Sequence, residues 1–421
     1  MSRPMTTSAA EITSDATRPE GAAAALRTTE AIRTRAVGLL SRARNGQSDN
    51  FTVDDSALPA TARIVADLTR QRYPDLSIPY HSRWRHFEAE NVDRTADLRR
   101  LLGEIDAGDR ARAMIDLTVV SVLLDAGAGA DWSFTEPSGV VLARSEGLGV
   151  ASWHAFVSGV FSSDPARPLM ADADGLRTLD ADTLATAFQV SDDNPLVGVD
   201  GRVRLLNRLG DQLASHPEVF GDQGRPGGLF DLLTESGPTE LPAHEILMAV
   251  LRHLSPIWLT GNDIDDVPLG DCWRHSAVDG QGLTAGWMPF HKLSQWLTYS
   301  LLEPFEWAGV TVTDLDALTG LPEYRNGGLL LDTGVLRAVD VSAAEQEWQV
   351  GDEFIVEWRA LTVALLDELA PLVRAELGVD EDAMPLACVL EGGTWAAGRS
   401  LARQRRGGMP PLNIVSDGTV F

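Results

Sequence analysis

Lysine is almost absent from this sequence. Lys292 is the one lysine among 421 residues, and arginine supplies the rest of the 35 basic side chains. Arginine keeps its proton in proteins, whereas the pKa of a lysine ammonium falls when it is buried, which suits nucleophilic, proton-transfer or carboxylate-pairing roles. Lys292 is therefore the first candidate for a catalytic residue. The alternative is a lysine that survived codon bias by chance on a solvated face.

Cysteine and long apolar runs are also scarce. The two cysteines, Cys272 and Cys388, are too few and too far apart for a disulfide framework or a cysteine metal cluster, which predicts a reducing cytoplasm. The first residues are small, polar and interrupted by prolines, without the apolar core of a signal peptide or the length of a membrane span. We therefore expect a disordered tail over residues 1–24 and a large catalytic domain over residues 25–421, either single or divided into two packed lobes.

Acidic residues outnumber basic residues in this chain. The sequence has 61 acidic and 35 basic residues, so its formal net charge is -26. Such a field repels phosphate backbones and anionic lipids, so neither nucleic acid nor a membrane is an expected partner. An anionic small molecule needs a pocket with its own arginines, helix N-termini or lysine. The oligomeric state is left open.

Helical periodicity dominates the chain. Apolar residues recur at helical spacings in the predicted helices Ala24–Arg44, Ala111–Leu124, Val203–Leu213 and Glu353–Leu377. In the last of these, Gly378 predicts the C-terminal stop, and Pro371 predicts a kink or break. Two stretches flanked by glycine or proline, Gly327–Leu336 and Pro385–Leu390, predict short strands. Strands and helices do not alternate as in a doubly wound sheet, so the predicted fold class is mainly helical with a few short strands.

The segment around Lys292 predicts a further helix. Pro289 suits its first turn, and Pro304 disfavours helix at the residue before it. Helical spacing then places four side chains on one face: Lys292, Gln295, Trp296 and Tyr299. A lysine beside an indole, a phenol and an amide indicates the wall of a polar pocket, although aromatic residues at this spacing are also typical of plain core.

No Gly-x-Ser-x-Gly elbow, Walker loop or dinucleotide fingerprint stands out. Glu323 and Arg325 precede a glycine pair on a predicted loop, where a carboxylate serves acid–base chemistry or merely caps a helix. The segment Asp263–His275 is rich in aspartate but has no recognised metal-ligand spacing, which favours a solvated acidic loop over a metal site. Arginine is the usual surface cation of this chain, but it also binds phosphate bidentately. Two phrases suit that role: IPYHSRWRHFE with His81, Arg83, Arg85 and His86, and EGGTWAAGRSLARQRR with Arg399 and Arg403.

Several long phrases carry a family resemblance. They are IPYHSRWRHFE, RPGGLFDLL, MPFHKLSQWLTYSLLEPFEWAG, LTGLPEYRNGGLLLDTGVL, LEGGTWAAGR and PPLNIVSDGTVF. Together they resemble a microbial uracil-catabolism family with a domain of unknown function, from about Arg35 to Phe421. The resemblance implies a route that converts uracil to its ribonucleotide, opens the ring, and releases urea through a ribosylurea-type intermediate.

Shorter phrases carry a second resemblance. PFHKLSQWL is similar to the PF-x-K-x-x-Q phrase of the queuosine-salvage nucleosidases, and LPEYRNGG is similar to their segment ending Asp-Tyr-Arg. LLDAGAGADWSF and FQVSDDNPL resemble further phrases of those enzymes. This resemblance implies a helical, DNA-glycosylase-like architecture and cleavage of a ribosyl C–N bond. It maps Lys292 onto their lysine and Glu323 onto their aspartate, with a longer side chain but the same charge.

The combined expectation is an N-glycosidase that hydrolyses the bond between ribose and a urea nitrogen, in ribosylurea or its 5'-phosphate, with no cofactor. Its transition state resembles an oxocarbenium ion, so Glu323 would supply the nearby carboxylate and activate water. Lys292 would pair with Glu323, polarise the leaving group or attack the anomeric carbon, and pairing is favoured. The expected substrate-binding residues are Trp132, Phe134, Trp296, Asp193, Arg325, Arg83, Arg85, His86 and Arg399.

Two other functions compete with this expectation. One is an amidohydrolase that cuts the ureido group, with a metal held in the segment Asp263–His275. The other is a non-catalytic subunit of the uracil pathway.

Overall fold

The computed structural model describes residues 15–415 and residue 419. This part of the chain is mainly helical, as its periodicity predicts. Its α-helices are α1 (Pro19–Leu26), α2 (Thr29–Arg44), α3 (Leu58–Arg72), α4 (Trp84–Phe87), α5 (Arg94–Leu102), α6 (Ala107–Leu123), α7 (Arg144–Val157), α8 (Ala173–Thr178), α9 (Ala181–Ala187), α10 (Val199–Ser215), α11 (Pro217–Phe220), α12 (Gly228–Thr234), α13 (Ala243–Leu254), α14 (Lys292–Trp307), α15 (Tyr324–Asp332), α16 (Glu353–Leu377), α17 (Leu386–Val389) and α18 (Trp395–Arg406).

The strands are short and join only in pairs within the described residues. The pairs are β1 (Phe51–Val53) with β10 (Leu336–Ala338), β2 (Ser133–Thr135) with β3 (Val141–Ala143), β4 (Glu240–Pro242) with β9 (Thr311–Thr313), β5 (Asp263–Ile264) with β6 (Val267–Pro268), β7 (Cys272–Arg274) with β8 (Trp287–Pro289), and β11 (Glu347–Trp348) with β12 (Asn413–Ile414). The pairs β4–β9 and β11–β12 are parallel, and the others are antiparallel. These pairs fasten loops and helix ends, so the core itself is built by helices.

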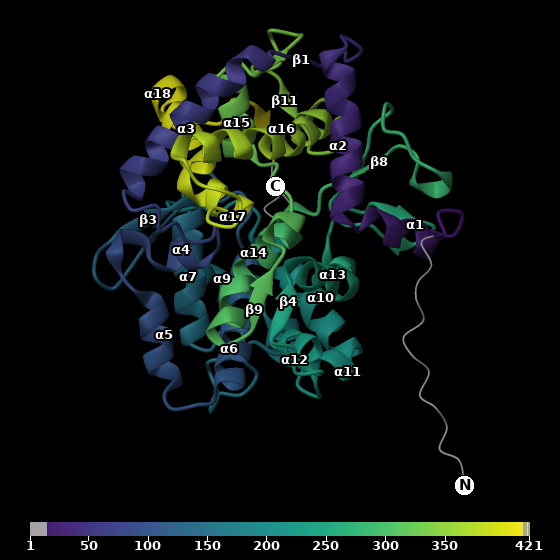
Figure 1. Ribbon diagram of the computed structural model, residues 1–421. Helices are drawn as coiled ribbons and strands as arrows, with labels where there is room; N and C mark the ends of the chain where they lie inside the picture. Colours follow the sequence, from purple (N-terminus) through teal and green to yellow (C-terminus); the bar gives the residue numbers. More distant parts are fainter. Residues whose placement is uncertain (1–14, 416–418, 420–421) are drawn as a thin grey trace.

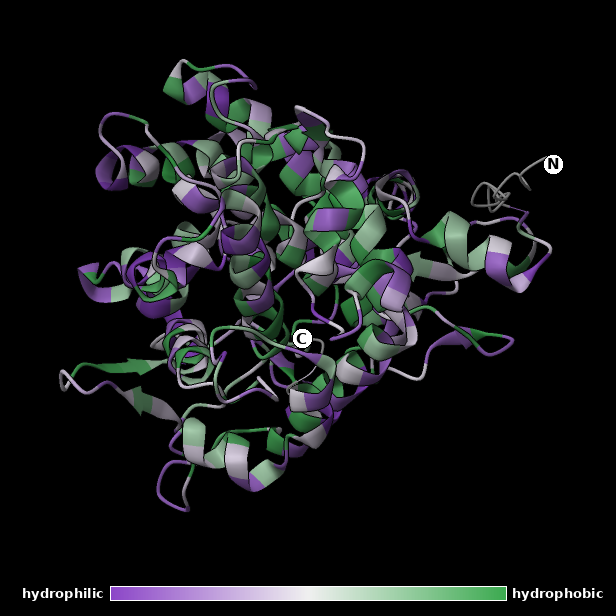
Figure 2. Ribbon diagram, turned by 90° about the horizontal axis from the view of Figure 1, so that it is seen from below, coloured by the Kyte–Doolittle hydropathy of each residue, from purple (hydrophilic) through white to green (hydrophobic). Residues whose placement is uncertain are grey.

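Helix α14 runs through the middle of the molecule, with α15 to α18 on one side of it and α6 to α13 on the other (Figure 1). It packs against α6 and α13, while α16 packs against α2 and α3, and α15 packs against α18. One hydrophobic core extends from Ile32 to Leu412 along the chain, and hydrophobic residues are concentrated along the central helices (Figure 2). Within residues 15–415, no helix is both long and apolar enough to cross a bilayer.

The N-terminal part of the chain differs from the expectation. Residues 1–14 of the predicted tail lie outside the described residues, but its last residues belong to α1, which packs against Ile264 and Trp287. The single helix predicted over Ala24–Arg44 is two helices. The cause is local, because the Thr28 side chain accepts a hydrogen bond from the Ala31 N–H at 3.1 Å and begins α2 as its N-cap.

Prolines interrupt the helices less than predicted. Helix α16 runs unbroken through Pro371, and α14 continues past Pro304 to Trp307. Both helices are buried along most of their length, so packing on several sides outweighs one missing N–H donor. Pro289 does not begin α14. It ends β8, and the helix starts at Lys292.

The two stretches predicted as strands are largely helical. Gly327 belongs to α15, and a Cβ at this position would lie 2.4 Å from the Trp358 ring, so glycine permits α15 to approach α16. In the second stretch, Pro385 is the N-cap of α17, which leads directly into a π-helical turn at Leu390–Thr394. Glycine and proline therefore mark a close helix contact and a helix start here, rather than strand ends.

Candidate active site

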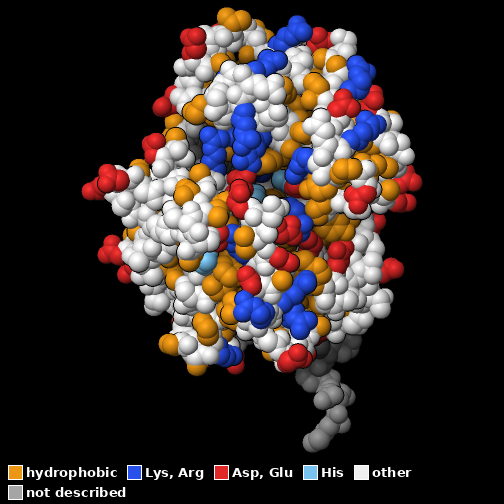
Figure 3. Space-filling view, turned by 90° about the vertical axis from the view of Figure 1, so that its left-hand side faces the viewer, with side chains coloured by type: hydrophobic (Ala, Val, Ile, Leu, Met, Phe, Trp, Pro, Cys, Tyr) orange, Lys and Arg blue, Asp and Glu red, His pale blue; other side chains and the backbone are white. Residues whose placement is uncertain are grey.

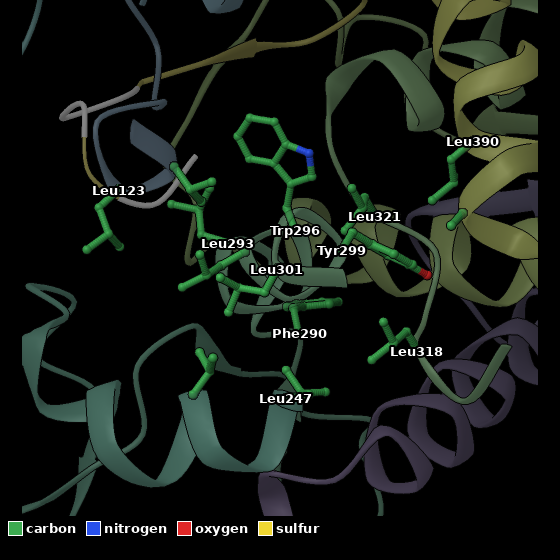
Figure 4. Close-up of a cluster of buried hydrophobic side chains, with 14 of the residues drawn as sticks. Leu123, Leu247, Phe290, Leu293, Trp296, Tyr299, Leu301, Leu318, Leu321 and Leu390 are labelled. Atoms are coloured by element: carbon green, nitrogen blue, oxygen red, sulfur yellow. The ribbon is translucent and has the colours of Figure 1, made fainter. Parts of the chain in front are cut away.

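A cavity of about 340 Å³, called here the central cavity, lies where the ends of several elements meet. Its wall combines Lys292 and Trp296 of α14, Glu323 before α15, the loop at residues 125–130 after α6, and the C-terminal segment at residues 409–414. Trp296 rises from α14 on the side away from the apolar packing around Phe290 and Leu247 (Figure 4). One face of α14 therefore belongs to the core, and the neighbouring face belongs to the cavity.

The start of α14 is held by a buried ion pair. The Lys292 backbone N–H donates to Asp271 Oδ2 at 2.8 Å. Asp271 also accepts hydrogen bonds from both terminal nitrogens of Arg359, at 2.8 and 2.7 Å. Burial would raise the pKa of Asp271, but Arg359 outweighs it and lowers the pKa to about 2. Asp271 therefore stays ionised and fixes the backbone from which the Lys292 side chain extends.

The surroundings of Lys292 disfavour its positive charge. Burial is the main cause that lowers the pKa of its ammonium, and Arg359 adds to the effect, whereas Glu323, Asp271 and Asp125 oppose it. The first turn of a helix is also the positive end of the helix dipole. A lysine whose pKa is lowered in this way exchanges its proton more readily than a surface lysine, a property suited to catalysis.

Glu323 faces the same cavity from the N-cap of α15. Its Oε2 accepts the Arg325 backbone N–H at 2.7 Å, and its Oε1 accepts the Asn326 backbone N–H at 2.6 Å. Burial raises the pKa of Glu323, while these two bonds and Lys292 oppose the rise. Glu323 thus has the capping role that the sequence left open. Each carboxylate oxygen still has a second lone pair for a ligand.

A third polar group in the cavity wall is built around Arg83. Arg83 Nη1 lies 3.0 Å from His86 Nδ1 and 3.3 Å from Asp125 Oδ1. Because a guanidinium only donates, Nδ1 of His86 accepts, which places the imidazole proton on Nε2. Burial, followed by Arg83, lowers the pKa of His86 to about 4. His86 is therefore a neutral hydrogen-bond donor at the cavity wall, with the Asp125 carboxylate beside it.

A second cavity of about 830 Å³, called here the arginine cavity, adjoins the first. His81, His86, Arg144 and Trp395 line both cavities. Three arginines of the two predicted phosphate-binding phrases, Arg85, Arg399 and Arg403, lie on the arginine cavity. Basic side chains gather around a hollow on the face of the molecule that includes α3 and α18 (Figure 3).

Several predicted binding residues line neither cavity. Arg83 is buried behind the wall, and Arg325 donates to the Gly408 carbonyl at 3.2 Å, so both act on wall residues rather than on a ligand. Trp132 and Phe134 belong to the hydrophobic core, where the Trp132 indole N–H donates to the Phe188 carbonyl at 2.9 Å. Asp193 is exposed in a surface turn between Ser191 and Asn194. The structure therefore does not place these predicted binding residues at either cavity. The segments that contain them build the fold around the site instead.

The aspartate-rich segment Asp263–His275 is spread over separate environments. Asp263 lies on the β5–β6 hairpin, Asp271 is paired with Arg359, and His275 Nε2 lies 3.3 Å from Glu357 Oε2. Within the described residues, no three His, Cys, Asp or Glu side chains are placed to hold a metal ion.

Sequence reasoning missed several wall residues. The most important is Asp125, which lies directly after α6 in the phrase LLDAGAGADWSF. Tyr324 and Trp395 also line the central cavity, as do Met409, Pro410, Leu412, Asn413 and Ile414. The phrases that carried the uracil-catabolism resemblance contained all of these residues except Asp125 and Met409. Asp125 lies in LLDAGAGADWSF, a phrase of the nucleosidase resemblance. The signal was therefore present, but nothing local distinguished a wall residue from its neighbours.

Fold and cavity together define a mainly helical protein whose central cavity brings one half-buried lysine close to two carboxylates. Residues 25–421 match the family described as "Protein of unknown function (DUF1688)", and the chain belongs to that family. The chain is 39% identical over 400 residues to "Protein urg3" of Schizosaccharomyces pombe, covering 93% of this chain and 96% of that protein. It is 38% identical over 412 residues to "Uracil catabolism protein 4" of Lachancea kluyveri, covering 90% and 93% of the two chains. The predicted family is thereby confirmed.

Proposed function

We propose that this protein is an N-glycosidase of uracil catabolism, which hydrolyses the ribosyl C–N bond of ribosylurea or its 5'-phosphate and releases urea. The pathway follows from the similarity to Uracil catabolism protein 4. The reaction follows from the chemistry of the central cavity. A DNA-glycosylase-like arrangement of the helices and a cytoplasmic location are parts of the same proposal.

The observation that carries the proposal is the meeting of Lys292 and Glu323 in one cavity wall. They come from the starts of two different helices, so the tertiary fold, and not sequence proximity, brings them together. Each is perturbed toward its neutral form, since burial lowers the pKa of Lys292 and raises that of Glu323. Paired groups with shifted pKa values in a cavity are typical of acid–base sites.

Hydrolysis of a ribosyl C–N bond makes three demands on a site. Positive charge develops at the anomeric carbon, a water must lose a proton as it attacks, and the departing nitrogen must gain one. Glu323 stabilises the developing charge and accepts the proton from water through its free lone pairs. The Lys292 ammonium pairs with Glu323 and gives a proton to the departing ureido nitrogen, and the proton that Glu323 takes from water then restores the ammonium. His86 Nε2–H donates a further hydrogen bond to the ligand.

The products test this assignment. Purified protein should convert ribosylurea, its 5'-phosphate, or both into equal amounts of urea and sugar. Cleavage of the ureido group would instead give ammonia, carbon dioxide and a ribosylamine, so separate assays of urea and ammonia distinguish the two reactions. Ammonia without urea from these substrates would contradict the glycosidase. A protein that converts neither substrate would also contradict it.

A further inference from the structure

The walls of the arginine cavity contain five arginines and three carboxylates: Arg72, Arg85, Arg144, Arg399, Arg403, Glu90, Glu146 and Glu391. In a chain with a net charge of -26, such an excess of positive charge in one hollow is a local feature rather than a property of the whole surface. The question is which of these arginines still has N–H groups available for a ligand.

Two of the arginines, Arg72 and Arg85, use both of their terminal nitrogens in contacts within the wall. Arg72 Nη2 donates to Glu391 Oε1 at 2.7 Å, and its other terminal nitrogen bonds to backbone carbonyls at the π-helical turn. Arg85 donates to Glu303 at 2.6 Å and to Glu88 at 2.9 Å. Because both terminal nitrogens of each side chain are engaged, Arg72 and Arg85 shape the wall and offer few donors to an anion.

The other three arginines have spare donors. Arg144 donates from Nη1 to the Gly408 carbonyl at 3.1 Å, and Arg399 uses Nη1 for Glu146, which leaves the remaining N–H groups of both side chains. Arg403 lies one helical turn after Arg399 on α18, and its side chain makes no hydrogen bond or ion pair with another residue in the described part of the chain. Guanidinium groups with unused N–H donors suit the oxygens of a phosphate, which they bind bidentately.

Arg144 connects this hollow to the central cavity, since it lines both. It is the first residue of α7 and has a left-handed backbone with φ 56°, an unfavourable conformation for a residue other than glycine. Strain of this kind persists where the surrounding structure imposes it, and it is common at ligand sites. A ligand that extends from one cavity into the other would therefore contact Arg144.

We propose that the arginine cavity binds the phosphate group of a ribosyl 5'-phosphate whose anomeric carbon lies in the central cavity, with Arg144, Arg399 and Arg403 as its donors. This inference rests on the proposed glycosidase function and narrows its substrate to the phosphorylated form.

The test compares the binding of ribose 5-phosphate, ribose and inorganic phosphate by isothermal titration calorimetry. The chain offers a matched pair of variants on α18, because Arg403 and Arg405 are both exposed, and only Arg403 lines the cavity. We expect ribose 5-phosphate to bind at least about tenfold more tightly than ribose, inorganic phosphate to compete with it, and Arg403→Gln to weaken it about tenfold. Arg405→Gln should leave the affinity unchanged.

The outcomes separate the subsite from the reaction. Equal affinity for ribose and ribose 5-phosphate would overturn the subsite, even if the enzyme releases urea from unphosphorylated ribosylurea. A preference for ribose 5-phosphate that Arg403→Gln and Arg405→Gln weaken equally would also overturn it, since the effect would then be one of overall charge. Tight, Arg403-dependent binding of ribose 5-phosphate without release of urea from either substrate would support the subsite and overturn the glycosidase.

Discussion

Replacing Glu323 by glutamine separates the two roles of this side chain. As an N-cap, the carboxylate accepts two backbone N–H bonds, and glutamine can accept only through its single carbonyl oxygen. Loss of one capping bond costs about 1 kcal/mol of stability. Loss of a preorganised charge beside an oxocarbenium-like transition state costs about two to three orders of magnitude in rate, or about 3–4 kcal/mol.

A matched control exists elsewhere in the chain. Asp172 is a buried carboxylate that caps α8, where Oδ1 accepts the Gly175 N–H at 2.9 Å and Oδ2 accepts the Ser163 N–H at 2.8 Å. It lines neither the central cavity nor the arginine cavity. Asp172→Asn should therefore lose about as much stability as Glu323→Gln, about 1 kcal/mol, while its rate of urea release stays near that of the wild type.

Two measurements on each variant decide the question. Unfolding in guanidinium chloride gives the free energy of unfolding, and kcat/KM for urea release gives the loss of transition-state stabilisation. A domain with 5–15 kcal/mol of stability remains folded after losing about 1 kcal/mol, so unfolding cannot imitate the expected loss of rate. The reasoning fails if Glu323→Gln keeps kcat/KM within about threefold of Asp172→Asn, because Glu323 would then be a structural cap alone.

Two further predictions concern neighbouring groups in the wall. Lys292→Arg keeps the positive charge but places a wider guanidinium group in a cavity of about 340 Å³. Urea release should be lost, while the melting temperature stays within a few degrees of wild type. Full activity in this variant would mean that Lys292 is a chance survivor. The pKa of His86 is about 4, so His86 is neutral above about pH 5 and becomes charged only as the pH falls toward 4. Any inflection of kcat/KM between pH 6 and 7 in the wild type should therefore remain in His86→Gln. An inflection that the variant loses would contradict the low pKa of His86.

The helical class could be predicted from sequence because it depends on local periodicity. Helix α16 keeps its apolar spacing over 25 residues, and Gly378 ends it in the left-handed conformation that the sequence predicts. The secondary-structure predictions were wrong where the role of a residue depends on a contact that is distant in sequence. Gly327 makes room for Trp358 of another helix, so its effect on α15 depends on a neighbour that the local sequence does not show.

The candidate site was predictable to the same extent. Lys292 and Glu323 stood out by rarity and by resemblance, and the fold does bring them to one wall. Asp125 did not stand out, because one aspartate among 61 acidic residues carries no local mark of function. Its importance comes from Arg83, which is fully buried and lies 3.3 Å from it. Arg83 was itself predicted to bind a ligand, whereas it orders the two groups, His86 and Asp125, that line the cavity.

The environment of Lys292 argues against the view that it is a chance survivor. Chance survival predicts a lysine on a solvated face, where its charge costs nothing. This lysine is instead half-buried in a cavity wall, where desolvation and the Arg359 guanidinium disfavour its charge, and it begins a helix at the positive end of the dipole. Each of these circumstances raises the free energy of the protonated lysine. Arginine replaces lysine everywhere else in this chain, but an arginine here could not lower that free energy by losing its proton. A position that disfavours a fixed charge but retains a titratable amine is better explained by a chemical role for that amine than by codon usage.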